Sequence, residues 1–233
     1  MPPMKTLGIV GGIGPESTVD YYRSLIRIWR EQTMDGSAPS ILVNSIDLKK
    51  MLDLIAANRL SEVTAYLSGE MERLARAGAD VGLLTANSAH IVFDELQRRS
   101  SIPLISIVEA TREAAEGRGF SRLGLFGIRF TVRGRFYPDV FSKAGISQIV
   151  PKEDKQAYID DKYMNELVNG VFLPETRDQL LTIVDRLAKQ EHVQGLILAG
   201  TELPLILRDT NSEIPFLDTT QIHVKAAINA LLS

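Results

Sequence analysis

Short apolar runs alternate with amphipathic stretches along most of the chain. The first run, Leu7–Val10, ends in a glycine-rich turn at 11–14, and residues 16–29 then carry apolar side chains at helical spacing. A short apolar run bounded by turn residues is typical of a buried strand, whereas recurrence at every third or fourth position is typical of a helix. The same criteria predict strands at 40–45, 81–85 and 104–107 and helices at 48–57, 60–77, 88–98 and 108–117.

The second half of the chain repeats the pattern of the first. Three segments recur in the same order and at a nearly constant offset: Leu7–Gly11 as Leu123–Gly127, Leu83–Asn87 as Ile197–Thr201, and Ser101–Ile105 as Glu213–Leu217. A repeat of this kind indicates two copies of one structural unit.

Alternation of strands and helices favours parallel sheets with helices on both faces. We therefore predict an α/β fold of two similar, pseudo-symmetric three-layer α/β/α domains with mainly parallel sheets. Residues 1–105 plus 215–233 are predicted to form the first domain, and residues 106–214 the second. Ligands of such folds bind beyond the carboxyl ends of the strands, and clefts between domains are common pockets. We expect the active site in a cleft between the two domains.

Composition narrows the class of protein. The chain has 233 residues, of which 45% are hydrophobic and 24% charged, with a formal net charge of −3. A nucleic-acid-binding protein would be expected to carry a basic surface, so this near-neutral charge argues against nucleic acid as a partner. No apolar run approaches the roughly 20 residues that span a bilayer. Residues 1–5 and the short apolar stretch after them do not form the apolar region of a secretory signal, so we expect a cytoplasmic protein.

The sequence contains no cysteine, which excludes a disulfide framework, a thiolate metal site and a thiol nucleophile. The three histidines, His90, His192 and His223, are far apart and form no metal-binding motif, so no metal site is predicted. The chain also lacks a P-loop and a GxSxG motif, which leaves phosphoryl transfer and serine hydrolysis without support.

The glycine-rich turn before the first predicted helix is a candidate anion site. Backbone N–H groups around Gly12 and Gly14, the helix dipole and the Thr18 hydroxyl would suit a carboxylate or a phosphate. As a dinucleotide fingerprint the turn is incomplete, because Ser17 stands where a third glycine is expected. A tight strand-to-helix turn without a ligand is the structural alternative.

Polar side chains also follow the strand predicted at 81–85. Asn87 and Ser88 offer an amide and a hydroxyl, although both are good helix-capping residues as well. His90 has the chemistry of an acid or base near neutral pH, and its alternative is a structural histidine in the first turn of a helix.

In the second half, Thr201 and Glu202 stand at the corresponding place. The Glu202 carboxylate could orient a substrate ammonium or act as a base, and a helix cap with an acidic first turn is the alternative. Thr131 follows the repeat of the first strand and is a candidate donor to a ligand carboxylate.

The segments Lys5–Tyr22, Ala86–His90 and Gly200–Glu202 resemble the aspartate/glutamate racemase family, the cofactor-independent amino-acid racemases, and the resemblance covers essentially the whole chain. It implies two similar α/β domains with the site between them, a homodimer, and no metal or pyridoxal phosphate. It also implies a small acidic amino acid or dicarboxylate as ligand. In that family two cysteines, one from each domain, flank the substrate α-carbon. One removes the α-proton as a thiolate, and the other returns a proton to the opposite face.

By the same resemblance, Ala86 and Gly200 stand at the positions of the two cysteines, and neither side chain can transfer a proton. His90 and Glu202 are the nearest substitutes for the missing acid/base pair. Ile128 stands where the family usually has a threonine. The substrate-binding residues that the resemblance implies are retained: Gly12, Gly14, Thr18, Asn87, Ser88, Thr131 and Thr201.

Three functions remain open at this point. The chain is a cysteine-free racemase that works through other groups, or it is a lyase or isomerase that acts on a small dicarboxylate without thiols. The third possibility is a non-catalytic protein that binds a carboxylate. One-sided chemistry needs only one acid/base group, so the loss of both thiols affects it less than it affects racemisation.

Overall fold

The computed structural model describes residues 4–233, so Met1–Pro3, part of the segment assessed for a secretory signal, lie outside the described residues. The chain divides into two compact units. Unit 1 comprises the chain up to Ser106 together with His223–Ser233, and unit 2 comprises Ile107–Ile222. The sequence prediction placed the return to the first domain at 215, whereas in the structure it comes at 223. The reason is that residues 216–218 form a strand of the sheet in unit 2.

The helices and strands follow one another in a regular α/β order. In unit 1 they are β1 (Thr6–Gly11), α1 (Pro15–Thr33), β2 (Ser40–Ser45), α2 (Leu48–Ala56), α3 (Leu60–Arg76), β3 (Val81–Leu84), the 3-10 helix η1 (Ser88–Val92) and α4 (Phe93–Arg99). In unit 2 they are α5 (Ile107–Glu116), β4 (Arg122–Phe126), α6 (Arg129–Arg133), α7 (Phe136–Phe141), η2 (Ser142–Ala144), β5 (Ser147–Ile149), α8 (Glu153–Asn165), η3 (Leu167–Asn169), α9 (Pro174–Glu191), β6 (Leu196–Leu198), α10 (Leu203–Leu207) and β7 (Phe216–Asp218). The last helix, α11 (Thr219–Leu232), begins in unit 2 and ends in unit 1.

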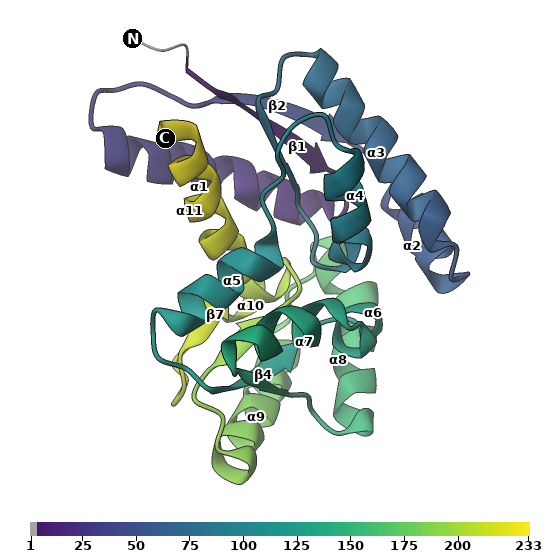
Figure 1. Ribbon diagram of the computed structural model, residues 1–233. Coiled ribbons are helices and arrows are strands. Elements are labelled where there is room, and N and C mark those ends of the chain that lie inside the picture. Colours follow the sequence, from purple (N-terminus) through teal and green to yellow (C-terminus); the bar gives the residue numbers. More distant parts are fainter. Residues whose placement is uncertain (1–3) are drawn as a thin grey trace. The chain divides into compact units, whose positions relative to one another are not determined.

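The sheet of unit 1 has the strand order β2-β1-β3, and both pairings are parallel. The odd residues of β1, Leu7 and Ile9, face a core to which α1 and α11 contribute. The other face is covered by α3, whose Leu74 packs near Gly8. Figure 1 shows α1 (purple) and α11 (yellow) on one side of this sheet and α3 (blue) on the other. Burial on both faces explains why β1 reads as a continuous apolar run.

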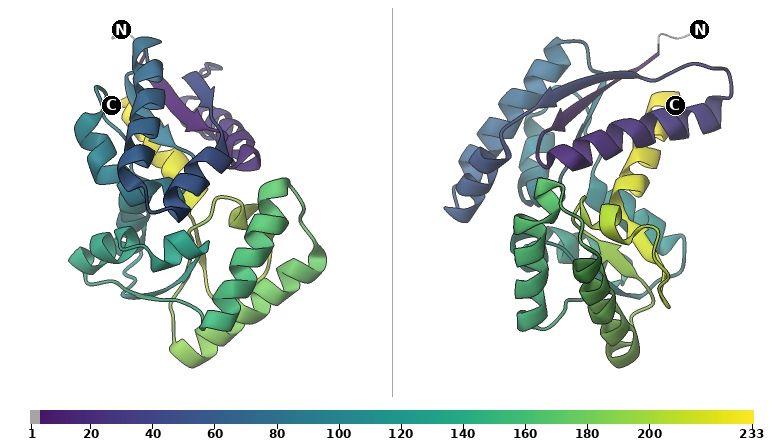
Figure 2. Two further views of the ribbon diagram at one scale, coloured as in Figure 1. Left: turned by 90° about the vertical axis from the view of Figure 1, so that its right-hand side faces the viewer. Right: turned by 180° about the vertical axis from the view of Figure 1, so that it is seen from behind.

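The sheet of unit 2 has the order β5-β4-β6-β7, again with parallel pairings throughout. Leu123 and Leu125 of β4 face a core shared with α5 and α7. Gly124 faces Leu187 of α9, which covers the opposite face with α8 packed beside it (Figure 2). In both β1 and β4, therefore, the apolar side chains on either side of the glycine face one core, and the glycine faces a helix on the opposite side of the sheet.

The two sheets share one topology, as the internal repeat predicted. β1, β2 and β3 correspond to β4, β5 and β6 in order and direction. The strand predicted at 104–107 is reduced to a single parallel bridge between Gly82 and Leu104, because α5 already begins at Ile107. The predicted helix 88–98 is split into η1 and α4.

Candidate functional site

The turn after β1 is closed by its own threonine. Gly12 has φ +78°, and a Cβ on it would lie 2.4 Å from the carbonyl oxygen of Ile46, so only glycine fits without strain. The Gly12 N–H donates to Oγ1 of Thr18 at 2.9 Å. Thr18 Oγ1 also lies 3.3 Å from the hydroxyl of Thr85, the residue that follows β3. Two threonine hydroxyls thus meet at the carboxyl ends of β1 and β3, which are paired as parallel strands.

Helix α1 begins directly behind this turn. Gly14, with φ +83°, is its N-cap residue, Pro15 occupies the first helical position, and no side chain caps the helix. The Gly12 N–H, which the sequence prediction offered to an anion, already has a partner in Thr18. An anion at this turn would therefore rely on the first turn of α1.

The segment after β3 is buried. Asn87 and Ser88, where the sequence predicts ligand-binding side chains, lie in or next to η1 and are less than a tenth exposed. His90 stacks on Phe93, and its Nδ1 lies 3.0 Å from the carbonyl oxygen of Ala86. Since a carbonyl only accepts, the proton of His90 resides on Nδ1.

Burial, and to a lesser extent the neighbouring His223, lower the pKa of His90 to about 3. The imidazole is therefore neutral at pH 7 and has only a proton-accepting role to offer there. The ring centroids of His90 and His223 are 6.2 Å apart.

His223 completes a buried network in unit 1 that the sequence did not predict. Its Nε2 donates to the carbonyl oxygen of Ile105 at 2.9 Å, and its Nδ1 accepts from the hydroxyl of Tyr21 at 2.8 Å. Burial lowers the pKa of His223 to about 4, so this ring is also neutral at pH 7. The network links α1 and α11 across the core of the unit.

The helices that follow β4 and β7 in unit 2 begin with two buried hydroxyls that have no hydrogen-bond partner. They are Oγ1 of Thr131, in α6, and Oγ1 of Thr220, at the start of α11. The adjacent Thr219 donates to the carbonyl oxygen of Leu198 at 2.8 Å. Buried polar atoms are normally paired, so an unpaired hydroxyl at the carboxyl edge of a parallel sheet is a place for a ligand or a water. Thr131 was predicted from the sequence, and Thr220 was not.

The loop after β6 holds a buried carboxylate. Glu202 is 2% exposed, and its Oε2 accepts hydrogen bonds from the hydroxyl of Tyr163 in α8 and, at 3.2 Å, from Oγ1 of Thr201. Burial raises the pKa of Tyr163 well above its ordinary value, and the charge of Glu202 raises it further. The phenol therefore keeps its proton at neutral pH and acts as a donor.

Tyr163 is the residue of this group that sequence reasoning missed. In the sequence it stands four positions after Ile159, and this helical spacing reads as an ordinary core position. Its separation of 39 residues from Glu202 leaves no local signal of their contact. Only the packing of α8 beside the end of β6 brings the two together.

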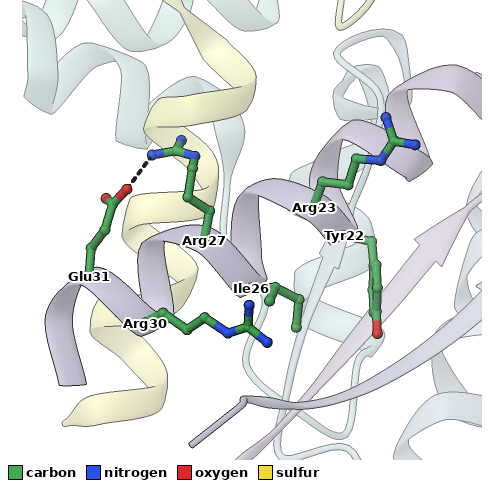
Figure 3. Close-up of a pocket in the computed structure, with 6 residues that line it drawn as sticks. All are labelled: Tyr22, Arg23, Ile26, Arg27, Arg30 and Glu31. Atoms are coloured by element: carbon green, nitrogen blue, oxygen red, sulfur yellow. Dashed lines mark hydrogen bonds and ion pairs between the residues drawn. The ribbon is translucent and has the colours of Figure 1, made fainter. Parts of the chain in front are cut away.

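A hollow on the surface of unit 1 lies away from all of these residues. It has a volume of about 460 Å³ and is lined by residues of α1 alone (Figure 3), namely Tyr22, Arg23, Ile26, Arg27, Arg30 and Glu31. Arg27 and Glu31 form an exposed ion pair at 2.9 Å across this face. None of the predicted site residues lines the hollow. Among residues 4–233, no three histidine, aspartate or glutamate side chains are grouped closely enough to hold a metal ion.

The model of the family described as Asp/Glu/hydantoin racemase matches residues 10–227. The chain belongs to this family. A broad-specificity amino-acid racemase, RacX of Bacillus subtilis, is 23% identical over 97% of this chain and 98% of that protein. Among solved structures, an Asp/Glu racemase-like protein from Yersinia pestis is 30% identical with a TM-score of 0.88, covering 99% of this chain and 100% of the other. An aspartate racemase homologue from Pyrococcus horikoshii is 28% identical with a TM-score of 0.85, at the same coverage.

Family membership confirms the resemblance on which the site residues were predicted, and the parallel α/β fold with two units agrees with it. Unit 1 holds Gly12, Gly14, Thr18, Ala86, Asn87, Ser88 and His90, whereas unit 2 holds Thr131, Gly200, Thr201 and Glu202. Across the described part of the chain, no helix combines the length and apolar character that a membrane span requires.

Proposed function

We propose that this racemase-family protein binds a small acidic amino acid or dicarboxylate and performs one-sided proton transfer at the carbon next to a carboxylate. The observation that carries the proposal is the buried Glu202 carboxylate, held by the hydroxyls of Tyr163 and Thr201 at the end of β6. The binding residues are those that the family resemblance implies. The unpartnered hydroxyls of Thr131 and Thr220 support a ligand with carboxylate oxygens in unit 2.

Glu202 is the proposed base. Its carboxylate takes the proton from the substrate C–H bond, and the electron pair of that bond passes into the neighbouring substrate carboxylate. The protonated Glu202 exchanges its proton with solvent, and a solvent-derived proton then returns from Glu202 to the same face of the carbon, so the substrate hydrogen is replaced with retention. Where a leaving group stands on the next carbon, the electron pair expels it instead and an alkene forms.

Inversion of the carbon needs a second acid on the opposite face, and Ala86 and Gly200 supply none. His90, the nearest substitute in unit 1, is neutral, and its Nδ1 proton is held by the carbonyl oxygen of Ala86. We therefore propose hydrogen exchange with retention, or elimination, in place of racemisation. From the resemblance we also propose a homodimer that needs no cofactor, and from the sequence a cytoplasmic location.

The test is incubation with L-aspartate and L-glutamate in deuterated water. Proton NMR measures loss of the α-hydrogen signal, and chiral chromatography measures the D-isomer. We expect the wild-type protein to deuterate the α-carbon without forming the D-isomer. The Glu202→Gln variant should not deuterate the α-carbon. Glu175→Gln, an exposed glutamate on α9, is the matched control and should exchange at the wild-type rate.

Elimination is tested with β-hydroxyaspartate by following the ultraviolet absorbance of its product. The reverse reaction, addition to a double bond, is tested by following the loss of maleate. Equal amounts of D- and L-isomer would contradict one-sided transfer. Calorimetric binding of aspartate or malonate without any turnover would instead assign the chain to non-catalytic carboxylate binding.

A further inference from the structure

Gly200 is a glycine for a steric reason. Its backbone is not among the positive-φ glycines, so its conformation is open to other residues. A Cβ built on it would lie 2.4 Å from Cε2, 3.0 Å from Cζ and 3.1 Å from the hydroxyl oxygen of Tyr163. All three atoms belong to one rigid aromatic side chain, which has no flexible end that can move aside.

The ring of Tyr163 is held in that place from both ends. Its helix, α8, anchors it beside Ile159, which is buried in the same unit, and its hydroxyl donates to Oε2 of Glu202. Tyr163 is only 6% exposed, so the packed surroundings leave little room for another rotamer. The space next to Gly200 is therefore permanently filled by a phenol.

We infer that Tyr163 is a further functional residue of unit 2, whose ring fills the space of a side chain at position 200 and whose hydroxyl positions the Glu202 carboxylate. This inference rests on the proposed function for the role of Glu202. By the family resemblance, position 200 is that of a catalytic cysteine, so the phenol stands where a thiol would begin. Tyr163 acts through Glu202 and is a positioning residue.

The steric part is tested by thermal unfolding of two alanine variants. Gly200→Ala should lower the melting temperature by at least about 4 °C, because the added methyl group overpacks the site against the ring. Gly69→Ala is the matched control, since Gly69 lies in α3 with nothing within 4 Å of its Cβ position. In a Tyr163→Ala background, Gly200→Ala should cost less than about 1 °C. Equal effects of Gly200→Ala and Gly69→Ala would overturn the steric assignment, as would an undiminished cost of Gly200→Ala without the ring.

The positioning part is tested by Tyr163→Phe, which keeps the ring and removes the hydroxyl. For α-hydrogen exchange of L-aspartate we expect kcat to fall about 10-fold, as for the loss of one hydrogen bond to a charged group, with KM unchanged within about twofold. Tyr158→Phe, on the same helix, should keep the wild-type kcat. A wild-type kcat in Tyr163→Phe would overturn the role of Tyr163 while leaving the proposed function intact. Absence of exchange in the wild-type protein would defeat the proposed function and with it the positioning role, and the unfolding experiment would still decide the steric part.

Discussion

The Nδ1 atom of His90 lies 3.0 Å from the carbonyl oxygen of Ala86, the residue that the family resemblance assigns to the first cysteine position. The ring is buried and stacked on Phe93. His90 is thus part of the packing of η1 and α4.

Stability should fall in mild acid because of His90. Burial lowers its pKa from 6.5 to about 3, so between these values the unfolded chain binds a proton that the folded chain does not. The contribution of His90 to the free energy of unfolding is therefore at its maximum above pH 6.5. It declines as the pH falls toward 3, by up to about 1.4 kcal/mol per pH unit for one histidine. Melting temperatures of His90→Gln measured from pH 7.5 to 4.5 should fall less steeply than those of the wild-type protein. The control is His192→Gln, at an exposed position, which should leave the wild-type dependence of melting temperature on pH unchanged. Parallel curves for His90→Gln and the wild-type protein would contradict the assignment.

The hydrogen bond between Tyr21 and His223 should stabilise unit 1. Tyr21→Phe removes the donor at 2.8 Å from Nδ1 of His223 and leaves that buried nitrogen without it. We expect the free energy of unfolding to fall by about 1–3 kcal/mol, measured by denaturation with urea. Tyr22→Phe, on the exposed side of the same helix, should change it by less than about 0.5 kcal/mol. A Tyr21→Phe variant as stable as Tyr22→Phe would show that the bond contributes nothing.

Cysteines introduced at positions 86 and 200 should not by themselves produce racemisation. Ala86→Cys with Gly200→Cys places the second side chain against the ring of Tyr163, because a Cβ at position 200 would lie 2.4 Å from Cε2. Adding Tyr163→Ala opens that space, and the triple variant should convert L-aspartate to a mixture with D-aspartate, measured by chiral chromatography. Because the wild-type chain has no cysteine, a thiol reagent will report each new thiol without background. Racemisation by the double variant at the rate of the triple variant would contradict this prediction.

The unpartnered hydroxyl of Thr131 should matter for ligand binding and not for folding. Thr131→Val replaces a buried hydroxyl that has no hydrogen-bond partner with a methyl group, so the melting temperature should stay the same or rise. Binding of malonate, measured by calorimetry, should weaken about 10-fold. Thr111→Val is the control: its hydroxyl donates to Ile107 at 2.6 Å, so this variant should lose stability, by about 1 kcal/mol. Undiminished malonate binding by Thr131→Val would remove Thr131 from the site.

The close approach of the chain at Gly12 should make that position intolerant of a side chain. Gly12 and Gly36 have the same φ of +78°, yet a Cβ on Gly36 would meet nothing within 4 Å. Gly36→Ala should therefore cost only the conformational penalty, about 1–2 kcal/mol. Gly12→Ala should cost a further 1–3 kcal/mol or so, because its methyl group meets the Ile46 carbonyl oxygen. Urea denaturation of both variants gives the difference, and equal losses would rule out the steric contribution.

The architecture of the sheets was predictable because its signals are local. Apolar runs that end in glycine turns predicted β1 and β4, and helical spacing predicted α2, α3 and α5 close to their observed ends, whereas α1 extends to Thr33, beyond its predicted end at 29. The internal repeat predicted two units of similar topology, which the matching strand orders confirm. The strand at 104–107 was wrong in extent, because the apolar pattern does not reveal that α5 starts at Ile107.

The fold class and the duplication follow from the amino-acid sequence, because apolar runs, turns and the repeat are signals carried by neighbouring residues. The assignment of Ala86 and Gly200 to the two cysteine positions rests on the family resemblance. The contacts between distant groups arise from the packing of helices and strands: Tyr163 meets Glu202, 39 residues away, and Tyr21 meets His223, 202 residues away. A buried tyrosine has a role beyond core packing when its hydroxyl binds a functional group, as that of Tyr163 binds Glu202. Helix packing determines this partner, and residues near Tyr163 in the sequence carry no signal of it.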